Sequence, residues 1–398
     1  MPHVVDTDKL VADGVIDVAQ SAEIIKRSRA LMVSLAINTI LCFGILAATL
    51  GLIFWLADAL SVAIFGFVAL AAGLFILAKA KDLYSMFGNS AALIGAGMLI
   101  GGAGIELVDK YEDIAGWVMV PGGALIAGIA GRALVGGGFT TRFVQGSILL
   151  MGLAMHLIGI GLLIAQHDPG GWIMPIVFLY TACLIAAAGY VTDVRFVTAL
   201  AIAPFAQMLD TSTSYFHAAY VFYSPEPVLS IIQMAVLVAI MLWVVANHSE
   251  RIGRHAFTLA IMGFIVLNLC ALVGSLWGDV VGQSMWGPDR WSDSSKTWED
   301  WQAEVEAFKA TTLVISANVF SILWAVFLAA CIVWAAFTAR RGLFNASMTF
   351  AAIHAYTQLF ESFADEPLAY VIGGLAAIPL AWGMWRADGL LAAQKENQ

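Results

Sequence analysis

The chain has 398 residues, of which 61% are hydrophobic and 12% are charged. Soluble proteins are roughly 45–50% apolar and about 25% charged, and disordered chains combine low hydrophobicity with high charge, so this composition excludes both classes. Since one membrane crossing takes roughly 20 apolar residues, the sequence predicts an all-α fold, a polytopic membrane helix bundle.

Residues 1–30 precede the first long apolar block. They mix acidic and basic side chains throughout, which no cleavable signal peptide does. Gly14 suits a helix C-terminus and Asp17 suits the N-cap of a following helix. We therefore expect residues 1–30 to form a cytoplasmic N-terminal pair of short helices, the second lying on the inner leaflet.

Twelve apolar blocks follow within residues 31–386, and they predict about 12 transmembrane helices in tandem hairpins. The blocks run from Leu31 to Leu56, Leu60 to Ala78, Ala91 to Leu107, Ile114 to Ala130, Phe143 to Ala165, Trp172 to Val191, Phe196 to Tyr223, Val228 to Ala246, Ala256 to Trp277, Leu313 to Phe337, Leu343 to Phe360 and Leu368 to Trp385. An even number of spans places both termini on the same side of the membrane.

The distribution of charge sets the orientation. With both termini inside, fifteen Lys and Arg residues fall in inner segments and four fall outside. Basic residues accumulate on the cytoplasmic side, so we expect an inner (plasma) membrane protein with cytoplasmic N- and C-termini and a cytoplasmic tail at 387–398. The outer segments are acidic. Such a face attracts cations or a basic partner, or it is the simple complement of the inner bases.

Spans three to five are rich in glycine, with Gly97 and Gly101 at the four-residue spacing that lets helix backbones approach closely. These helices are expected to pack in the centre of the bundle.

One sequence pattern lies near the N-terminus and comprises Leu10, Gly14-Val15-Ile16, Ala22 and Ile25. A second pattern lies in the last predicted hairpin. The hairpin pattern comprises Gly342-Leu343-Phe344-Asn345 through Phe360, then Gly373-Gly374 and Trp385-Arg386. Over about a quarter of the chain, these residues resemble a family of uncharacterised multi-pass bacterial membrane proteins that share a domain of unknown function. The resemblance implies a bacterial membrane protein and carries no activity, substrate or catalytic residue with it.

The seventh span contains an acidic side chain. If it crosses the membrane, Asp210 lies at its middle, and Gln207, Asp210, Ser214 and His217 share one helix face at spacings of three, four and three residues. Ionisable groups in hydrocarbon are costly, and broken helices form transporter sites at the midplane, so this face predicts a cation or proton site. Alternatively, the span ends near Leu209 and the following aromatic residues form an interfacial belt that leaves Asp210 in water.

The eleventh span carries His354, Gln358 and Glu361 at positions i, i+4 and i+7, on one helix face. His156 lies near the middle of the fifth span. Because histidine titrates near neutral pH, these residues predict a polar path that relays protons. The alternative is that they form hydrogen bonds between helices and only fix the bundle.

The outer loop at 279–311 is rich in tryptophan, with Trp286, Trp291, Trp298 and Trp301. Thr297 and Asp300 have the spacing of a capping box and predict a helix that starts there. Its apolar stripe is expected to lie on the outer leaflet or cap the bundle. The alternative is a docking surface for a partner, anchored by exposed tryptophans.

The sequence has no HExxH pair, phosphate-binding loop or nucleophile elbow. No catalytic residue, metal ligand set, cofactor or nucleic-acid partner is therefore expected, and an enzyme is the least supported class. Two functions remain. The first is a transporter-like permease for a small, cationic or proton-coupled solute. The alternative is a non-catalytic accessory or assembly subunit that binds another membrane or periplasmic complex through its acidic outer face and tryptophan loop. Lipids are the expected surroundings in both, and the sequence leaves the oligomeric state open.

Overall fold

The structure is a computed structural model of the chain. It describes residues 7–56, 58–79, 85–136, 142–169, 172–209, 226–288, 297–338 and 340–362, together with single positions between 368 and 382.

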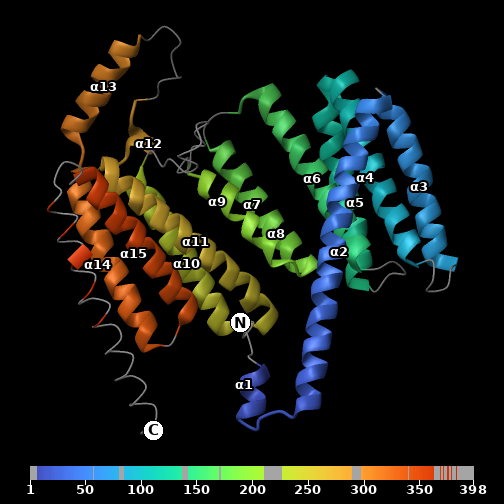
Figure 1. Cartoon of the computed structure of the whole chain (residues 1–398). Coiled ribbons are helices and arrows are strands. Elements are labelled where there is room, and N and C mark those ends of the chain that lie inside the picture. The colour runs from blue at the N-terminus through green and yellow to red at the C-terminus, as the bar shows by residue number, and fades with distance from the viewer. Residues whose placement is uncertain are drawn as a thin grey trace. The chain divides into compact units, whose positions relative to one another are not determined.

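The described residues are almost entirely helical (Figure 1). The helices are α1 (Thr7–Ala12), α2 (Val18–Leu56), α3 (Ala59–Lys79), α4 (Ser85–Lys110), α5 (Glu112–Gly136), α6 (Arg142–His167), α7 (Ile173–Thr192), α8 (Arg195–Leu200), α9 (Ile202–Gln207), α10 (Pro227–Asn247), α11 (Glu250–Trp277), α12 (Gln283–Trp286), α13 (Trp298–Thr311), α14 (Ala317–Phe337) and α15 (Arg341–Ser362). Two short strands, β1 (Asp279–Val280) and β2 (Val314–Ile315), complete the described elements.

Eight of these helices are long and apolar enough to cross a membrane: α3, α4, α5, α6, α7, α10, α11 and α14. The chain is therefore a multi-pass, all-α membrane bundle, as the composition predicts. The first and eleventh predicted spans lie in α2 and α15, which are helical but not among the eight. The seventh predicted span begins as two short helices, α8 and α9, and then passes beyond the described residues.

The surface supports a lipid environment. Large apolar side chains are exposed on it, among them Phe54 at 82% and Val135 at 80%, while Asn268 and Ser347 inside the bundle are fully buried at 0%. Soluble proteins rarely expose extensive apolar surface. In a bilayer, lipid tails cover such side chains, and polar groups turn toward the neighbouring helices.

The N-terminal segment contains the predicted turn but not the predicted second short helix. Gly14 has a φ of 69°, and Asp17 and Gln20 exchange side-chain-to-backbone hydrogen bonds at the start of α2. From Val18 the helix continues without a break to Leu56. No glycine or proline occurs between Val18 and Gly44, so nothing in the sequence ends the helix at the membrane surface.

The chain divides into two compact units, the first comprising Met1–Gly170 and Ala187–Val197. Two helix pairs form much of this unit, α3 with α4 and α5 with α6. Both pairs pack through glycines that recur seven residues apart on each helix: Gly66 and Gly73 on α3, Gly95 and Gly102 on α4, Gly116 and Gly123 on α5, and Gly152 and Gly159 on α6.

The glycine contacts show how close these backbones are. A Cβ at Gly95 would lie 2.2 Å from the backbone nitrogen of Leu70, and one at Gly123 would lie 2.4 Å from that of His156. No side chain fits at such distances, so the helices touch backbone to backbone. The prediction that small residues let helix backbones approach closely is confirmed for the third to fifth spans, α4 to α6, although glycines other than Gly97 and Gly101 make these contacts and α4 makes its contacts with α3.

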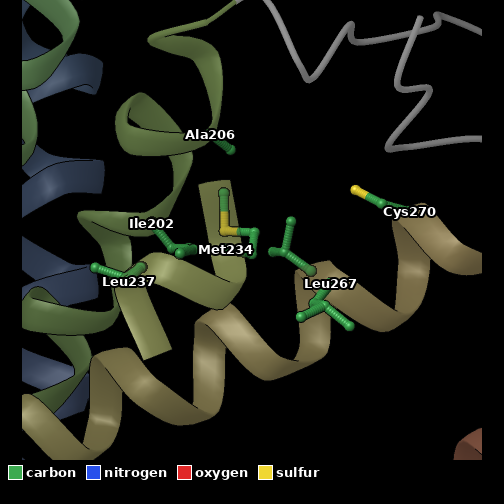
Figure 2. Close-up of a cluster of buried hydrophobic side chains, with 7 residues drawn as sticks. Ile202, Ala206, Met234, Leu237, Leu267 and Cys270 are labelled. Atoms are coloured by element: carbon green, nitrogen blue, oxygen red, sulfur yellow. The ribbon is translucent and has the colours of Figure 1, made fainter. Parts of the chain in front are cut away.

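The second unit comprises Gly171–Ala186 and Thr198–Gln398. In it α10 packs against α11, α14 against α15, and α11 against α14. One buried cluster joins α9, α10 and α11, as Figure 2 shows; its members are Ile202, Ala206, Met234, Leu237, Val266, Leu267 and Cys270. A second cluster joins α11, α14 and α15 through Ala271, Trp324, Leu328 and Phe350.

The tryptophan loop is closed at its base by a two-residue antiparallel ladder. Asp279 pairs with Ile315, and Val280 pairs with Val314. The strand β2 occupies the start of the predicted tenth span, so α14 begins only at Ala317. The loop thus leaves and rejoins the helix bundle at one point, and α12 and α13 lie between the two strands in sequence.

Candidate functional site

The sequence-predicted path residues fall in separate parts of the chain. His156 belongs to the first unit, and Gln207, His354 and Gln358 belong to the second. Asp210, Ser214, His217 and Trp291 lie outside the described residues, and Glu361 lies in α15 without a described side chain. The predicted face of the seventh span is therefore represented only by Gln207, which ends α9 and is half-buried.

His156 is a packing residue of the α5–α6 pair. It is 6% exposed, and its Nδ1 lies 2.7 Å from the carbonyl oxygen of Val120. A carbonyl only accepts hydrogen bonds, so Nδ1 carries the proton and donates. Its backbone also faces Gly123 at the closest approach of the two helices. For His156, this geometry favours the second of the two sequence-based interpretations, a hydrogen bond that fixes neighbouring helices, over a place on a proton path.

Three polar side chains lie between α11, α14 and α15: Asn268 and Trp324, which are buried, and His354, which is half-buried. We call these three residues the polar cluster. The indole N–H of Trp324 donates to the side-chain oxygen of Asn268 over 2.9 Å. The amide of Asn268 donates in turn to the carbonyl oxygen of Phe264, 2.8 Å away on the same helix. The ring of His354 meets that of Trp324 edge-on, with centroids 4.7 Å apart and an interplanar angle of 62°.

Two polar atoms on α15, the Nδ1 of His354 and the Oγ of Ser347, are buried and have no hydrogen-bond partner within the part of the chain that the structure describes. They are seven residues apart and so share a helix face, with the buried Phe350 between them. Buried polar groups in proteins are nearly always hydrogen-bonded. A histidine ring nitrogen that has no fixed hydrogen-bond partner can take up or release a proton. Gln358 lies on the same face of α15, one helical turn after His354.

A second arrangement, two buried carboxylates, was missed by the sequence analysis, which grouped both residues with the other outer acids. Glu226, the N-cap residue of α10, is 3% exposed, and Asp279, just after α11, is 5% exposed. Glu226 accepts hydrogen bonds from the backbone N–H groups of Gly282, at 2.7 Å, and Ser284, at 3.1 Å. Asp279 accepts one from the N–H of Val228, at 2.7 Å. Each carboxylate thus binds the segment that carries the other.

The electrostatics of this pair are unusual for an outer loop. Burial, and to a smaller extent the neighbouring charge of Glu226, raise the pKa of Asp279 to about 6, while the N–H groups of Val228 and Val280 act in the opposite direction. The sequence did contain a local signal, because Glu226 stands between two prolines in Pro225-Glu226-Pro227. The pairing with Asp279 carries no such signal, since it joins residues more than fifty positions apart.

The tryptophan loop contains half-buried and exposed tryptophan side chains. Thr297 and Asp300 form the predicted capping box at the start of α13. Trp298 and Trp301 stack with centroids 4.9 Å apart, and the indole N–H of Trp301 donates to the carbonyl oxygen of Pro288 over 3.3 Å. Trp286 on α12 is 73% exposed and Trp298 is 49% exposed. The predicted helix that starts after Thr297 is confirmed, and two tryptophan side chains remain accessible.

Within the part of the chain that the structure describes, no three His, Cys, Asp or Glu side chains gather as a metal site. Comparison of the chain with protein-family models, with curated proteins and with solved structures gave no match.

Proposed function

We propose that this chain is an integral inner-membrane permease for a small, cationic or proton-coupled solute, with twelve spans and both termini in the cytoplasm. The eight apolar helices support the membrane location. The excess of fifteen basic residues over four on the proposed inner side supports the orientation.

The observation that carries the proposal is the free ring nitrogen of His354. Its Nδ1 is buried and has no hydrogen-bond partner among the described residues. Polar and ionisable residues inside membrane bundles are costly, and they characteristically mark ion and proton paths. The other two members of the polar cluster are satisfied, since Trp324 donates to Asn268 and Asn268 donates to Phe264. His354 is therefore the member that has a site left to exchange a proton.

In this proposal the cluster positions the histidine and α15 carries the proton. Trp324 holds the imidazole edge-on, and its own N–H is occupied by Asn268, so it does not compete for Nδ1. Neutral imidazole has one donor and one acceptor nitrogen, which allows it to receive a proton on one side and release one on the other. Gln358 and Glu361 extend the path along the same face of the helix, and Asp210 is the proposed acidic member outside α15.

Proton movement in proteoliposomes tests the proposal. The full-length protein is reconstituted in vesicles that contain a fluorescent pH indicator, and gradients of Na⁺, K⁺ and methylammonium are applied in turn. We expect at least one gradient to drive proton flux in the wild type and His354→Gln to abolish it. The control is His248→Gln, because His248 also meets a tryptophan edge-on, Trp243 at 5.6 Å, but lies exposed at the end of α10. Equal flux in the His354 variant would remove the proposal's basis.

A second candidate function rests on the exposed side chains of Trp286 and Trp298. Large accessible tryptophans are typical interface anchors, which favours an accessory subunit that docks another complex through the tryptophan loop. Native mass spectrometry of the protein, extracted gently with its lipids, separates the two functions. A stoichiometric foreign subunit that is lost in a Trp286→Ala, Trp298→Ala double variant supports docking, whereas a monomer or symmetric homo-oligomer argues against it.

A further inference from the structure

Glu226 and Asp279 are two buried carboxylates that have no basic partner among the described residues. They are 3% and 5% exposed, and Glu226 adds to the negative potential at Asp279. Burying an uncompensated charge costs several kcal/mol even after relaxation. Backbone N–H groups satisfy three of the four carboxylate oxygens, but hydrogen bonds from neutral amides leave the net negative charge in place.

Two oxygen atoms of this site are left over. The Oδ1 of Asp279 and the Oγ of Ser284 are both buried and make no hydrogen bond to any described residue. Ser284 belongs to the site because its backbone N–H donates to Glu226. Its hydroxyl is therefore attached to the same short segment that the carboxylates hold, and only oxygen ligands are presented.

We propose that Asp279, Glu226 and Ser284 bind a hard cation of the calcium class at this end of α10 and α11. Calcium takes oxygen ligands from carboxylates, hydroxyl groups, backbone carbonyls and water in an irregular geometry. The carboxylate oxygens of Glu226 keep a second lone pair for the ion while they accept the two N–H groups. This inference does not depend on transport.

A proton is the competing occupant, and the pair of buried carboxylates favours the cation over it. One proton neutralises one of the two carboxylates, whereas one divalent cation balances two negative charges. A cation can coordinate Oδ1 and the hydroxyl of Ser284 without requiring these two atoms to touch each other. With only two carboxylates, the site resembles weak extracellular calcium modules, with a Kd of about 0.1–1 mM.

Binding there would tie the tryptophan loop to the helix bundle. Asp279 opens the β1–β2 ladder that closes the loop, and Glu226 begins α10. A cation shared by the two residues links both segments through one charge centre, in addition to the three backbone hydrogen bonds.

Terbium luminescence provides a local test, because Tb³⁺ replaces calcium in oxygen sites and is sensitised by a nearby indole. The Trp286 ring lies against Gly282, 2.7 Å from the position a Cβ would take there, and so next to the segment that holds Glu226. With the full-length protein in detergent micelles, we expect saturable Tb³⁺ emission that Ca²⁺ displaces. Trp286→Phe is expected to dim this emission while the protein still binds Ca²⁺ by calorimetry.

Two variants and a control make the test specific. Asp279→Asn and Ser284→Ala are each expected to weaken Ca²⁺ binding at least tenfold, and Ser284→Ala does so without changing any charge. Glu299→Gln, an exposed acid at the start of α13, is expected to bind like the wild type. Absence of saturable binding in the wild type, or unchanged affinity in Ser284→Ala and Asp279→Asn, would overturn the proposal. If Ca²⁺ has no effect and Asp279→Asn raises the melting temperature at neutral pH, the carboxylate is ionised there without a bound cation, and the cation site is refuted.

Discussion

Trp324 on α14 donates its indole N–H to the side-chain oxygen of Asn268 on α11, and neither side chain is more than 3% exposed. The bond joins two helices that also meet through apolar side chains and through a hydrogen bond from Ser321 Oγ to the carbonyl oxygen of Ser275, at 3.4 Å. It also fixes the indole against which the ring of His354 packs. Asn268 therefore fixes the indole of Trp324, and this indole in turn positions the ring of His354.

Replacing Asn268 by leucine should destabilise the bundle. The substitution leaves the Trp324 N–H buried without an acceptor, which costs roughly 1–3 kcal/mol. Unfolding in mixed micelles of increasing SDS content measures the loss. Asn247→Leu is the control, because Asn247 is exposed and donates only to Trp243 of its own helix. Equal stability of the two variants would mean that the Asn268 bond contributes nothing.

The glycine contacts of α5 and α6 predict a steep positional effect. Gly123→Ala places a Cβ 2.4 Å from the backbone nitrogen of His156, so the helices must separate, and we expect a loss of roughly 1–3 kcal/mol. Gly128→Ala on the same helix meets nothing within 4 Å and should change stability by less than ~1 kcal/mol. The same SDS unfolding assay applies. A harmless Gly123→Ala would contradict the backbone contact.

The capping box at α13 predicts a local effect rather than a global one. Thr297→Ala removes the side chain that accepts the Asp300 N–H, and N-cap losses of this kind cost about 1 kcal/mol. Hydrogen exchange read by mass spectrometry should show faster exchange in the first turn of α13 and unchanged exchange in α14. Uniform acceleration along both helices would instead point to a role in the whole unit.

The carboxyl of Asp279 predicts a pH dependence of stability in the presence of a chelator. Its pKa rises from 3.8 to about 6 on folding, so the folded state binds the proton more tightly than the unfolded state. Stability should therefore fall as the pH rises from about 4 to about 6, and the full penalty should remain above that range. Asp279→Asn should remove this slope from melting curves recorded across the window. A wild-type slope of the opposite sign would contradict the burial argument.

Calcium should reverse the sign of this effect. A bound cation requires ionised Asp279, so Ca²⁺ competes with the proton and its stabilisation should grow as the pH rises through about 6. The comparison is between melting temperatures with Ca²⁺ and with chelator at each pH. If the difference in melting temperature were the same at all pH values, the stabilisation by Ca²⁺ would not depend on the ionisation of Asp279.

Local signals in the sequence were sufficient for most of the helices. Hydrophobic length predicted the span Leu60 to Ala78, and the structure has α3 at Ala59–Lys79. The turn at Gly14 and the cap at Thr297 were also predicted, because the groups that form each of them are only three residues apart in the sequence. Such features depend on neighbours along the chain, which a single sequence displays directly.

The candidate sites depend on partners that are distant in sequence, and there the prediction was incomplete. His354 was singled out as an ionisable residue in an apolar span, but its contact with Trp324 joins different helices. Asp279 was treated as one of many acidic loop residues, because no residue close to it in the sequence indicates a hydrogen bond with the N–H of Val228. Periodicity identifies the face of a helix, but it does not identify the helix that the face contacts.

The most direct test of the permease proposal is charge movement at His354, because it needs no knowledge of the solute. Proteoliposomes adsorbed on a solid-supported membrane receive a rapid pH jump, and the transient current reports proton binding inside the protein. The account predicts a transient in the wild type and in His248→Gln that is absent in His354→Gln. A transient of the same size in His354→Gln would show that the polar cluster carries no proton, and the central claim would fail.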